Sequence, residues 1–223
     1  MKISIVIPAY NEAKNIGLVL DSLRREKFPI VVVDDGSKDK TFDIASKYVR
    51  TLRDLTVLRH KVNLGKGAAL KTGCESAILS GAEGIIIMDS DGQHRVADLP
   101  KFIEVLNGGK YDIVFGSRDI NMNMPLVRFI GNKVASALIS FLFWIYISDL
   151  ICGFRAFTKT AYRKLNLKSS NYGIETEMVA KVGKLRLKHC EIPVETVYYD
   201  KFKGVTILDA LGILFDVFIW KIR

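Results

Sequence analysis

Two aspartates separated by a single residue are the sharpest chemical signal in this chain. Asp89 and Asp91 lie in the segment MDSDGQH, directly after an apolar run. Two carboxylates held this close in a cleft repel each other, and a divalent cation relieves the repulsion. Oxygen ligands suit Mg²⁺ or Mn²⁺, which keep coordination positions for diphosphate oxygens. A polar turn would explain Asp91 before Gly92 but not Asp89, so the pattern favours a metal site, with Gln93 or His94 as a further candidate ligand.

Three other polar loops carry residues that suit a nucleotide. The loop PAYNE (8–12) offers an aromatic ring for a base, and Glu12 either contacts base or ribose groups or simply begins a helix. The loop DDGSKDKT (34–41) places Asp34 and Asp35 where an acid can hold a ribose hydroxyl or a base N–H. The segment NLGKGAAL (63–70) is too short for a phosphate loop and is only a weak candidate for an anion contact.

The elements that must position these loops follow from the spacing of apolar residues. Short β-branched runs predict strands at 3–7, 30–33, 55–58, 84–88 and 113–115, with helical patterns between them. Strand and helix in alternation imply an α/β fold, with a mostly parallel sheet and helices on both faces. Ligands of such sheets bind beyond the carboxyl ends of the strands, where the four loops lie.

The regular alternation of predicted strands and helices ends after Arg118. We expect a loop at 121–125, a long apolar helix, a short strand at 154–157, and helices at 158–165 and 174–184. Residues 205–223 combine an apolar face with Trp220 and two terminal cations, which suits an amphipathic helix in a membrane interface. A terminal helix packed on the sheet is an equal alternative.

Length, cysteine content and net charge exclude some classes of protein. The 223 residues fit one domain, and three scattered cysteines without a CxxC pair argue against a disulfide framework and indicate a reducing, intracellular compartment. The net charge is +9, of which residues 118–223 contribute +7. The positive electrostatic field of this half suits a phosphorylated substrate or an anionic membrane. We rank nucleic acid last, because the basic half lacks a recognisable motif for reading it.

Together the loops resemble the family 2 glycosyltransferases of GT-A fold. The matching segments VIPAYNE, VVDDGSKDKT, NLGKGAAL and MDSDGQH mark the superfamily. The segments GSR (116–118), CGFRAF (152–157) and YGIETEM (172–178) resemble the dolichyl-phosphate mannose synthase-like branch, whose acceptors are polyprenyl phosphates. The resemblance implies one GT-A domain over 1–204, with a nucleotide-sugar and metal half at 1–117 and an acceptor half at 118–204, followed by the interfacial helix 205–223.

The resemblance also implies roles for particular residues. Asp91 and Arg118 would be catalytic, and Asp89, Asp91 and Gln93 would hold Mg²⁺ or Mn²⁺. The acceptor phosphate would meet Arg118, Arg128 and Asn132, where Asn132 stands in place of a usual serine. The implied nucleotide-sugar contacts are Pro8, Tyr10, Glu12, Val33, Asp35, Asp89, Ser90, Asp91, Gln93 and Lys201. Lys201 replaces a usual arginine, so it keeps the charge but loses the bidentate fork.

The expected reaction is inverting transfer of a hexose from GDP-mannose, UDP-glucose or UDP-N-acetylglucosamine to a polyprenyl phosphate. A phosphate monoester is already anionic near pH 7, so it needs cations rather than a general base. Transfer to a soluble or saccharide acceptor, with Glu175 or Glu177 as base, stays open as an alternative. A nucleotide-binding module without turnover is a third possibility. The presence of both Asp89 and Asp91 argues against it.

The location of the expected reaction follows from its acceptor. We expect a protein on the cytosolic face of the membrane, held there peripherally, because the longest uncharged run, 134–148, is too short to span a bilayer. The apolar run 135–147 would lie beside the isoprenoid chain or form a core helix. Its aromatic residues, which slightly favour exposure at the interface, are Phe141, Phe143, Trp144 and Tyr146.

Overall fold

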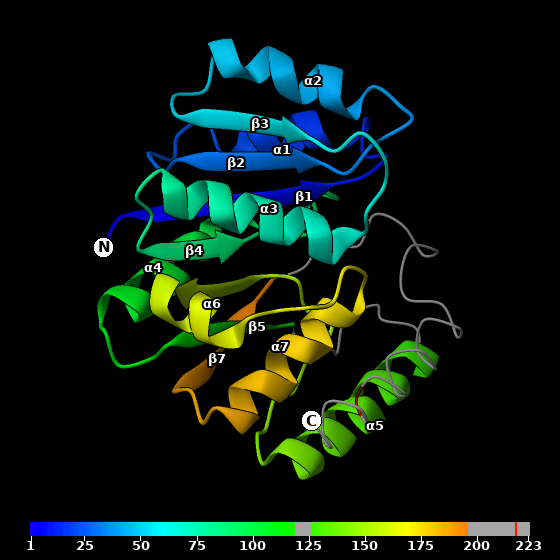
Figure 1. Cartoon of the computed structure of the whole chain (residues 1–223), viewed down its shortest axis with the longest axis vertical. Coiled ribbons are helices and arrows are strands. Elements are labelled where there is room, and N and C mark those ends of the chain that lie inside the picture. Colours follow the sequence, from blue (N-terminus) through cyan, green and yellow to red (C-terminus); the bar gives the residue numbers. More distant parts are fainter. Residues whose placement is uncertain (119–125, 196–216, 218–223) are drawn as a thin grey trace.

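The computed structural model describes residues 1–118, 126–195 and Val217, with the backbone alone for 126–134 (Figure 1). The strands are β1 (Ile3–Ala9), β2 (Ile30–Asp34), β3 (Leu55–Arg59), β4 (Gly84–Ile87), β5 (Ile113–Arg118), β6 (Arg155–Thr158) and β7 (His189–Val194). The α-helices are α1 (Ile16–Ser22), α2 (Thr41–Lys47), α3 (Lys66–Leu79), α4 (Leu99–Asn107), α5 (Leu126–Phe143), α6 (Lys159–Leu165) and α7 (Gly173–Lys184). Two short 3₁₀ turns, η1 (Tyr48–Arg50) and η2 (Val96–Asp98), complete the described elements.

The described strands form one sheet in the order β3-β2-β1-β4-β6-β5-β7. Strand β6 runs antiparallel to both β4 and β5, while the other neighbouring pairs are parallel. The carboxyl ends of β1, β2 and β4 therefore meet at one edge, as the loop motifs require. The mostly parallel sheet that the sequence predicts is confirmed.

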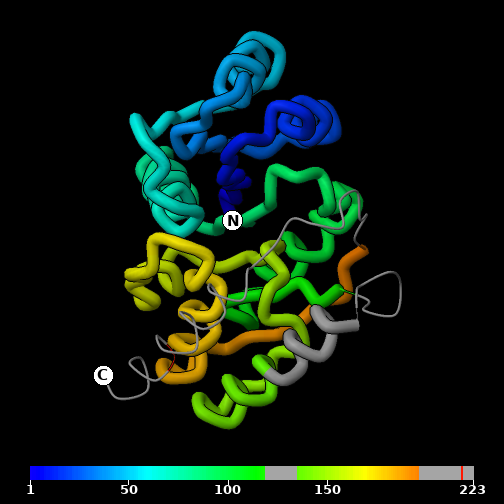
Figure 2. The backbone as a smooth tube through the Cα atoms, turned by 90° about the vertical axis from the view of Figure 1, so that its right-hand side faces the viewer, coloured from blue at the N-terminus to red at the C-terminus, as the bar shows by residue number. Residues whose placement is uncertain are grey.

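Helices cover both faces of the sheet, each over its own core (Figure 2). Along β1, Ile5 and Ile7 belong to the core under α1, α2 and α4, whereas Val6 belongs to the core under α3, α5, α6 and α7. Side chains of a strand alternate between faces, so a sheet buried on both needs an apolar residue at nearly every position. The near-continuous apolar run of β1 meets that need.

The sequence-based boundaries agree with the structure except at the far edge of the sheet. The predicted strands and the helices at 158–165 and 174–184 are present, with ends that agree within one or two residues except at β5, which runs three residues beyond the predicted 113–115. Strand β7 was not predicted, because its segment HCEIPV is mixed in polarity and largely half-buried. The predictions for 121–125 and 205–223 lie outside the described residues. No helix among the described residues is long and apolar enough to cross a membrane.

Candidate functional site

A cleft of about 430 Å³ opens at the carboxyl ends of β1, β2 and β4. All four loop motifs contribute to its walls, and so does the segment before α7. Its lining residues are Pro8, Ala9, Tyr10, Glu12, Asp35, Asn63, Gly65, Lys66, Ala69, Asp89, Ser90, Asp91, Asn171 and Tyr172. The cleft thus lies where parallel α/β sheets bind their ligands.

Hydrogen bonds between neighbouring loops fix the wall that holds Tyr10. The backbone N–H of Asn11 donates to Ser37 Oγ over 2.9 Å, and the N–H of Glu12 donates to Thr41 Oγ1 over 2.8 Å. The loop after β1 is therefore fastened to the loop after β2, and its aromatic side chain is 39% exposed toward the opening. An exposed ring on a fixed backbone is suited to stacking on a base.

Asp35 organises the third loop. Its Oδ1 accepts the backbone N–H of Leu64 over 3.0 Å and lies 2.7 Å from His60 Nδ1, while its Oδ2 accepts the N–H of Gly65 over 2.8 Å. The carboxylate thus shapes the turn into α3 as well as lining the cleft. Lys66, the first residue of α3, is placed by this turn.

A half-buried cluster of charges forms the floor of the cleft. Lys66 Nζ lies 2.8 Å from Asp89 Oδ1 and 2.7 Å from Glu175 Oε1, which makes an ion pair on each side. The second oxygen of Asp89 lies 3.2 Å from His94 Nε2. Burial alone would raise the pKa of Asp89, but the charge of Lys66 and the contact with His94 outweigh it and hold that pKa well below its usual range.

The same balance applies to the lysine. Burial by itself lowers the pKa of Lys66, yet the charges of Asp89 and Glu175 outweigh burial and raise it. Lys66 and Asp89 are therefore both charged at neutral pH. Asp89 and Glu175 lie far apart in the sequence and meet only through this lysine.

The carboxylates of Asp89 and Asp91 fit a divalent cation. Burial and the charge of Asp89 raise the pKa of Asp91, which is the repulsion a cation would relieve. Asp89 Oδ1 is buried, and its contact among the described residues is the 2.8 Å ion pair with Lys66 Nζ. Within the described residues no third His, Cys, Asp or Glu completes a metal-binding group with them. Further ligands would be diphosphate and water oxygens, as Mg²⁺ commonly has.

The position of Asp89 depends on a glycine from the acceptor half. Gly153, in the turn before β6, packs so closely that a Cβ there would overlap the carboxylate of Asp89. The segment CGFRAF therefore forms the wall against which the first aspartate rests.

Arg118 is held by a carboxylate. Its Nε lies 2.7 Å from Asp149 Oδ2 and its second guanidinium nitrogen 2.9 Å from Asp149 Oδ1, a bidentate pair. The Asp149 side chain is fully buried, and that of Arg118 is 11% exposed. The pair fixes the guanidinium at the end of β5, but Arg118 is not among the residues that line the cleft.

Two other charged residues of the acceptor half, Glu177 and Arg155, are occupied by structural contacts. Glu177 accepts the backbone N–H groups of Lys168 and Ser169 and lies 2.8 Å from Lys181 Nζ. Arg155 is 1% exposed, and its guanidinium donates to the carbonyls of Cys152, Leu150 and Glu175. Burial lowers the pKa of Arg155. Neither residue faces the cleft as a free base or cation.

The structure brings most of the expected nucleotide contacts together. Pro8, Tyr10, Glu12, Asp35, Asp89, Ser90 and Asp91 all line the cleft. Val33 and Gln93 do not, because Val33 is fully buried in the core and Gln93 follows the turn with its backbone N–H on Asp91. The side chains of Arg128 and Asn132 and the whole of Lys201 lie outside the described residues, so their roles stay predictions.

Sequence reasoning does not single out several contributors to the cleft, among them Lys66, Asn171 and Tyr172. The segment that contains Lys66 is only a weak candidate for an anion contact in the sequence, and no sequence motif assigns Asn171 and Tyr172 to the donor site. The lysine carries a signal that could have been used, since it follows the third parallel strand and so lies at the same edge as the aspartates. The approach of the segment 169–172 to Gly65 and Gly67 depends on long-range packing and leaves no local signal.

Comparisons with known proteins show which family the chain belongs to. The model of glycosyl transferase family 2 matches residues 4–165. The chain is 31% identical to a UDP-N-acetylglucosamine–dolichyl-phosphate N-acetylglucosaminyltransferase of Methanococcus voltae, over 98% of this chain and 96% of that protein. It is also 31% identical to a dolichyl-phosphate beta-glucosyltransferase of Trichomonas vaginalis, over 99% of this chain and 76% of that protein.

A solved structure is similar in fold. It is glucosyl-3-phosphoglycerate synthase from Mycobacterium tuberculosis, in complex with Mn²⁺, uridine-diphosphate-glucose and phosphoglyceric acid. The TM-score is 0.68 at 20% identity, over 98% of this chain and 78% of that one. This likeness confirms the GT-A architecture. The family match covers most of the chain, and together with the aspartate pair at the sheet edge it establishes that the chain belongs to the family 2 glycosyltransferases.

Proposed function

We propose that the protein transfers a hexose from a nucleoside-diphosphate sugar to a polyprenyl phosphate, with inversion at the anomeric carbon. The observation that carries the proposal is the cleft in which Asp89 and Asp91 lie beside Tyr10 and Asp35, since it joins a candidate diphosphate site to a candidate base site. The two dolichyl-phosphate transferases to which the chain is similar support the acceptor class.

The donor would lie across the carboxyl edge of the sheet. Tyr10 and Glu12 would face the base and ribose, and Asp89 and Asp91 would hold Mg²⁺ or Mn²⁺ at the diphosphate. That cation would neutralise the leaving nucleoside diphosphate. Lys66 would keep Asp89 ionised and fixed in place, because the two are in contact at the floor of the cleft. The Mn²⁺ in the M. tuberculosis complex is consistent with such a cofactor.

The chemistry of the acceptor explains why no free base is needed. An oxygen of the lipid phosphate forms the new bond to the anomeric carbon, the bond from that carbon to the diphosphate breaks, and no proton needs to be removed. Glu175 is paired with Lys66, and Glu177 with Lys181 and two backbone N–H groups. Both candidate bases are thus occupied, which favours a phosphate over a sugar hydroxyl as nucleophile.

The acceptor phosphate would approach from the end of β5. Arg118 stands there, and Asp149 fixes the orientation of its guanidinium. Arg128, Asn132 and Lys201 complete the proposed set of phosphate contacts. A lipid-linked acceptor places the reaction at a membrane, and we propose the cytosolic face, where nucleotide sugars and the protein's positive charge would both be used.

The test is transfer of radiolabelled sugar from UDP-glucose, UDP-N-acetylglucosamine and GDP-mannose to a polyprenyl phosphate in detergent, with Mn²⁺ or with EDTA. We expect one donor to be used, only with the metal and only with the phosphorylated lipid. The unphosphorylated polyprenol is the matched control. Transfer to the free alcohol or to a soluble saccharide at a comparable rate would refute the phosphate acceptor. Turnover that is unaffected by EDTA would refute the role of the cation.

A further inference from the structure

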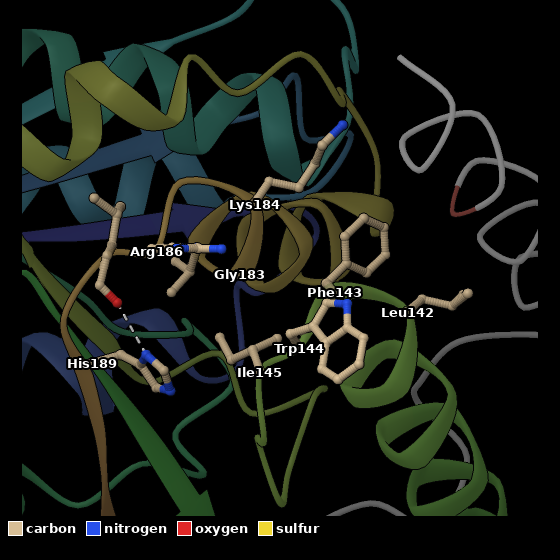
Figure 3. A pocket seen from close by; sticks show the side chains of 10 residues that line it. Leu142, Phe143, Trp144, Ile145, Gly183, Lys184, Arg186 and His189 are labelled. Carbon is tan, nitrogen blue, oxygen red and sulfur yellow. Dashed lines mark hydrogen bonds between the residues drawn. The ribbon is translucent and has the colours of Figure 1, made fainter.

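Helix α7 has a cavity at each of its ends. The cavity at its last turn, of about 650 Å³, lies beside Gly183 and the end of α5 (Figure 3). The cavity at its first turn is the cleft of the candidate site, where Tyr172 precedes the helix. Glu175, in this first turn, contacts Lys66 at the floor of the cleft. The contact joins α7 to α3 at the site proposed for the donor.

The backbone that carries Lys66 is fixed on both sides. Before it, the N–H of Gly65 donates to Asp35 Oδ2 over 2.8 Å. After it, the N–H of Ala68 donates to the carbonyl oxygen of Ser170 over 3.0 Å. The Cα of Lys66 is therefore held in place, and the position of its ammonium depends on the groups around that ammonium.

The ammonium of Lys66 can bind more than its two carboxylates. Its Nζ lies 2.7 Å from Glu175 Oε1 and 2.8 Å from Asp89 Oδ1. A lysine ammonium carries three N–H groups, and two contacts with single carboxylate oxygens occupy two of them. The side chain is 20% exposed and lines the cleft, so a ligand in the cleft can reach the third N–H.

The charges around Lys66 indicate which kind of group would bind there. The carboxyl groups of Asp89, Asp91 and Glu175 gather at the floor of the cleft around one lysine. With these three ionised and His94 neutral, a divalent cation would bring the site only to neutrality. Without the lysine, the site would stay negative and would repel a diphosphate. Lys66 therefore supplies positive charge at the place where the donor diphosphate is proposed to lie.

We propose that Lys66 is a donor-binding residue, whose third N–H donates to an oxygen of the donor diphosphate while Glu175 and Asp89 hold the ammonium in position. The leaving nucleoside diphosphate would then have a contact with this lysine in addition to the cation. The inference rests on the proposed function for the class of donor and deepens it by naming a residue that binds the leaving group. Its test needs no acceptor, so it is independent of the lipid phosphate.

The test compares Lys66→Met with Lys71→Met on the same helix. Lys71 donates to the carbonyl oxygen of Lys168 over 3.0 Å, so the control removes an equal charge and a contact with the segment before α7. Titration calorimetry at saturating Mn²⁺ measures the affinity for UDP and UMP, and for GDP and GMP. We expect Lys66→Met to weaken diphosphate binding about 10–100-fold and monophosphate binding less than about 3-fold. Lys71→Met should change neither by more than about 3-fold.

The affinity for Mn²⁺ alone should change in the opposite direction. Without nucleotide, the electron paramagnetic resonance signal of free Mn²⁺ reports how much of the ion is bound. Lys66→Met removes a positive charge beside Asp89, so we expect Mn²⁺ to bind at least about 5-fold more tightly. A lysine that only orients Asp89 would instead make Mn²⁺ and diphosphate binding weaker together, and that result would overturn the proposal.

A second variant separates ligand binding from folding, because Lys66→Met leaves two carboxylates without their cation. Adding Glu175→Gln should restore part of the lost stability. It should not restore the affinity for the diphosphate, since the ammonium is still missing. Recovery of both the stability and the affinity would show that Lys66 acts only through the fold.

Three other results would overturn the proposal. An equal loss of affinity for UDP and UMP would place Lys66 away from the second phosphate. Unchanged affinity for UDP with weaker binding of UDP-glucose or UDP-N-acetylglucosamine would assign the ammonium to the sugar. A wild-type protein that binds neither UDP nor GDP would refute the proposed donor as well. Failure to transfer sugar to a polyprenyl phosphate, by contrast, would refute only the acceptor and leave the binding results intact.

Discussion

At the scale of single residues, the aspartate pair is the feature on which the reaction depends most. Asp91→Asn keeps the side-chain shape but removes one negative ligand from the proposed cation site. We expect sugar transfer to fall by about 10²–10³-fold. We expect the fold to be retained, because the substitution relieves the repulsion that raises the pKa of Asp91.

The control for this variant is Glu104→Gln, an exposed carboxylate on α4. Asp98 is less suitable, since it is buried, pairs with Lys101 and accepts the backbone N–H of Glu195. The measurement is transfer rate against Mn²⁺ concentration, with circular dichroism to confirm folding. Near-normal turnover of Asp91→Asn at the same Mn²⁺ concentration would contradict the role of this carboxylate.

Lys66 allows a second prediction at this scale. Lys66→Met leaves Asp89 and Glu175 facing each other without a cation, and removing one partner of a buried ionic group typically costs about 3–5 kcal/mol. We expect Lys66→Met to lower the free energy of unfolding in urea with EDTA by this order. Glu175→Gln added to it should restore part of the loss, because one of the two unpaired charges is gone.

The double-mutant cycle is the decisive comparison for this cluster. A coupling energy near zero between positions 66 and 175 would mean that the ion pair contributes nothing. Mn²⁺ should stabilise Lys66→Met more than the wild type, since a cation at Asp89 would replace part of the lost positive charge. Equal stabilisation of both proteins by Mn²⁺ would argue against a cation at Asp89.

At the scale of elements, the turn before β6 determines where Asp89 lies. Gly153→Ala introduces a Cβ into the space of the Asp89 carboxylate, so one of the two must move. We expect the affinity for Mn²⁺ with nucleoside diphosphate to fall by about 10–100-fold, as for other residues that orient metal ligands. Titration calorimetry measures it. Gly108→Ala, where the new Cβ would meet nothing closer than 3.4 Å, is the control.

The segment between α6 and α7 depends on Glu177. Burial would raise the pKa of this carboxyl, but the hydrogen bonds from Lys181 and from the backbone of residues 168 and 169 outweigh it and lower the pKa below 4.5. A carboxyl with a lowered pKa stabilises the fold above its unfolded pKa, and this contribution is lost as the pH falls through the folded value. The stabilisation should therefore be complete at pH 7.

Glu177→Gln should lower the free energy of unfolding by about 1–3 kcal/mol at pH 7, and by progressively less below pH 4.5. Urea unfolding of both proteins at several pH values measures the difference. Glu104→Gln should change stability by less than about 0.5 kcal/mol at neutral pH, as expected of a surface substitution. A Glu177→Gln difference that does not change with pH would assign the effect to shape rather than charge.

At the scale of the whole molecule, the donor should stabilise the fold, because its proposed site joins the loops that follow β1, β2 and β4. A ligand at 100 times its dissociation constant adds about 2.7 kcal/mol, which corresponds to about 5–11 °C in Tm for a protein of this size. We expect UDP or GDP with Mn²⁺ to produce such a shift and EDTA to reduce it. Equal shifts with and without Mn²⁺ would show that the nucleotide binds independently of a cation.

The sequence by itself determined the features that are local in the chain. The apolar runs predicted the strands, and the parallel alternation placed the polar loops at one sheet edge, so the grouping of Tyr10, Asp35, Asp89 and Asp91 could be predicted. The family was also evident from these motifs, because each is a short segment whose chemistry depends on residues next to one another. Strand β7 could not be predicted, because its pairing with β5 and not its own sequence pattern makes it a strand.

Only the tertiary structure decided which distant residues meet. Lys66 lies between Asp89 and Glu175, Gly153 rests against Asp89, and Gly183 lets α5 approach α7, although none of these partners are near in sequence. The same holds for Trp144, which is exposed although its neighbours are buried. The physical reason is that backbone conformation follows mainly from neighbouring residues, whereas the partner of a charge and the cover of an apolar face depend on how elements pack.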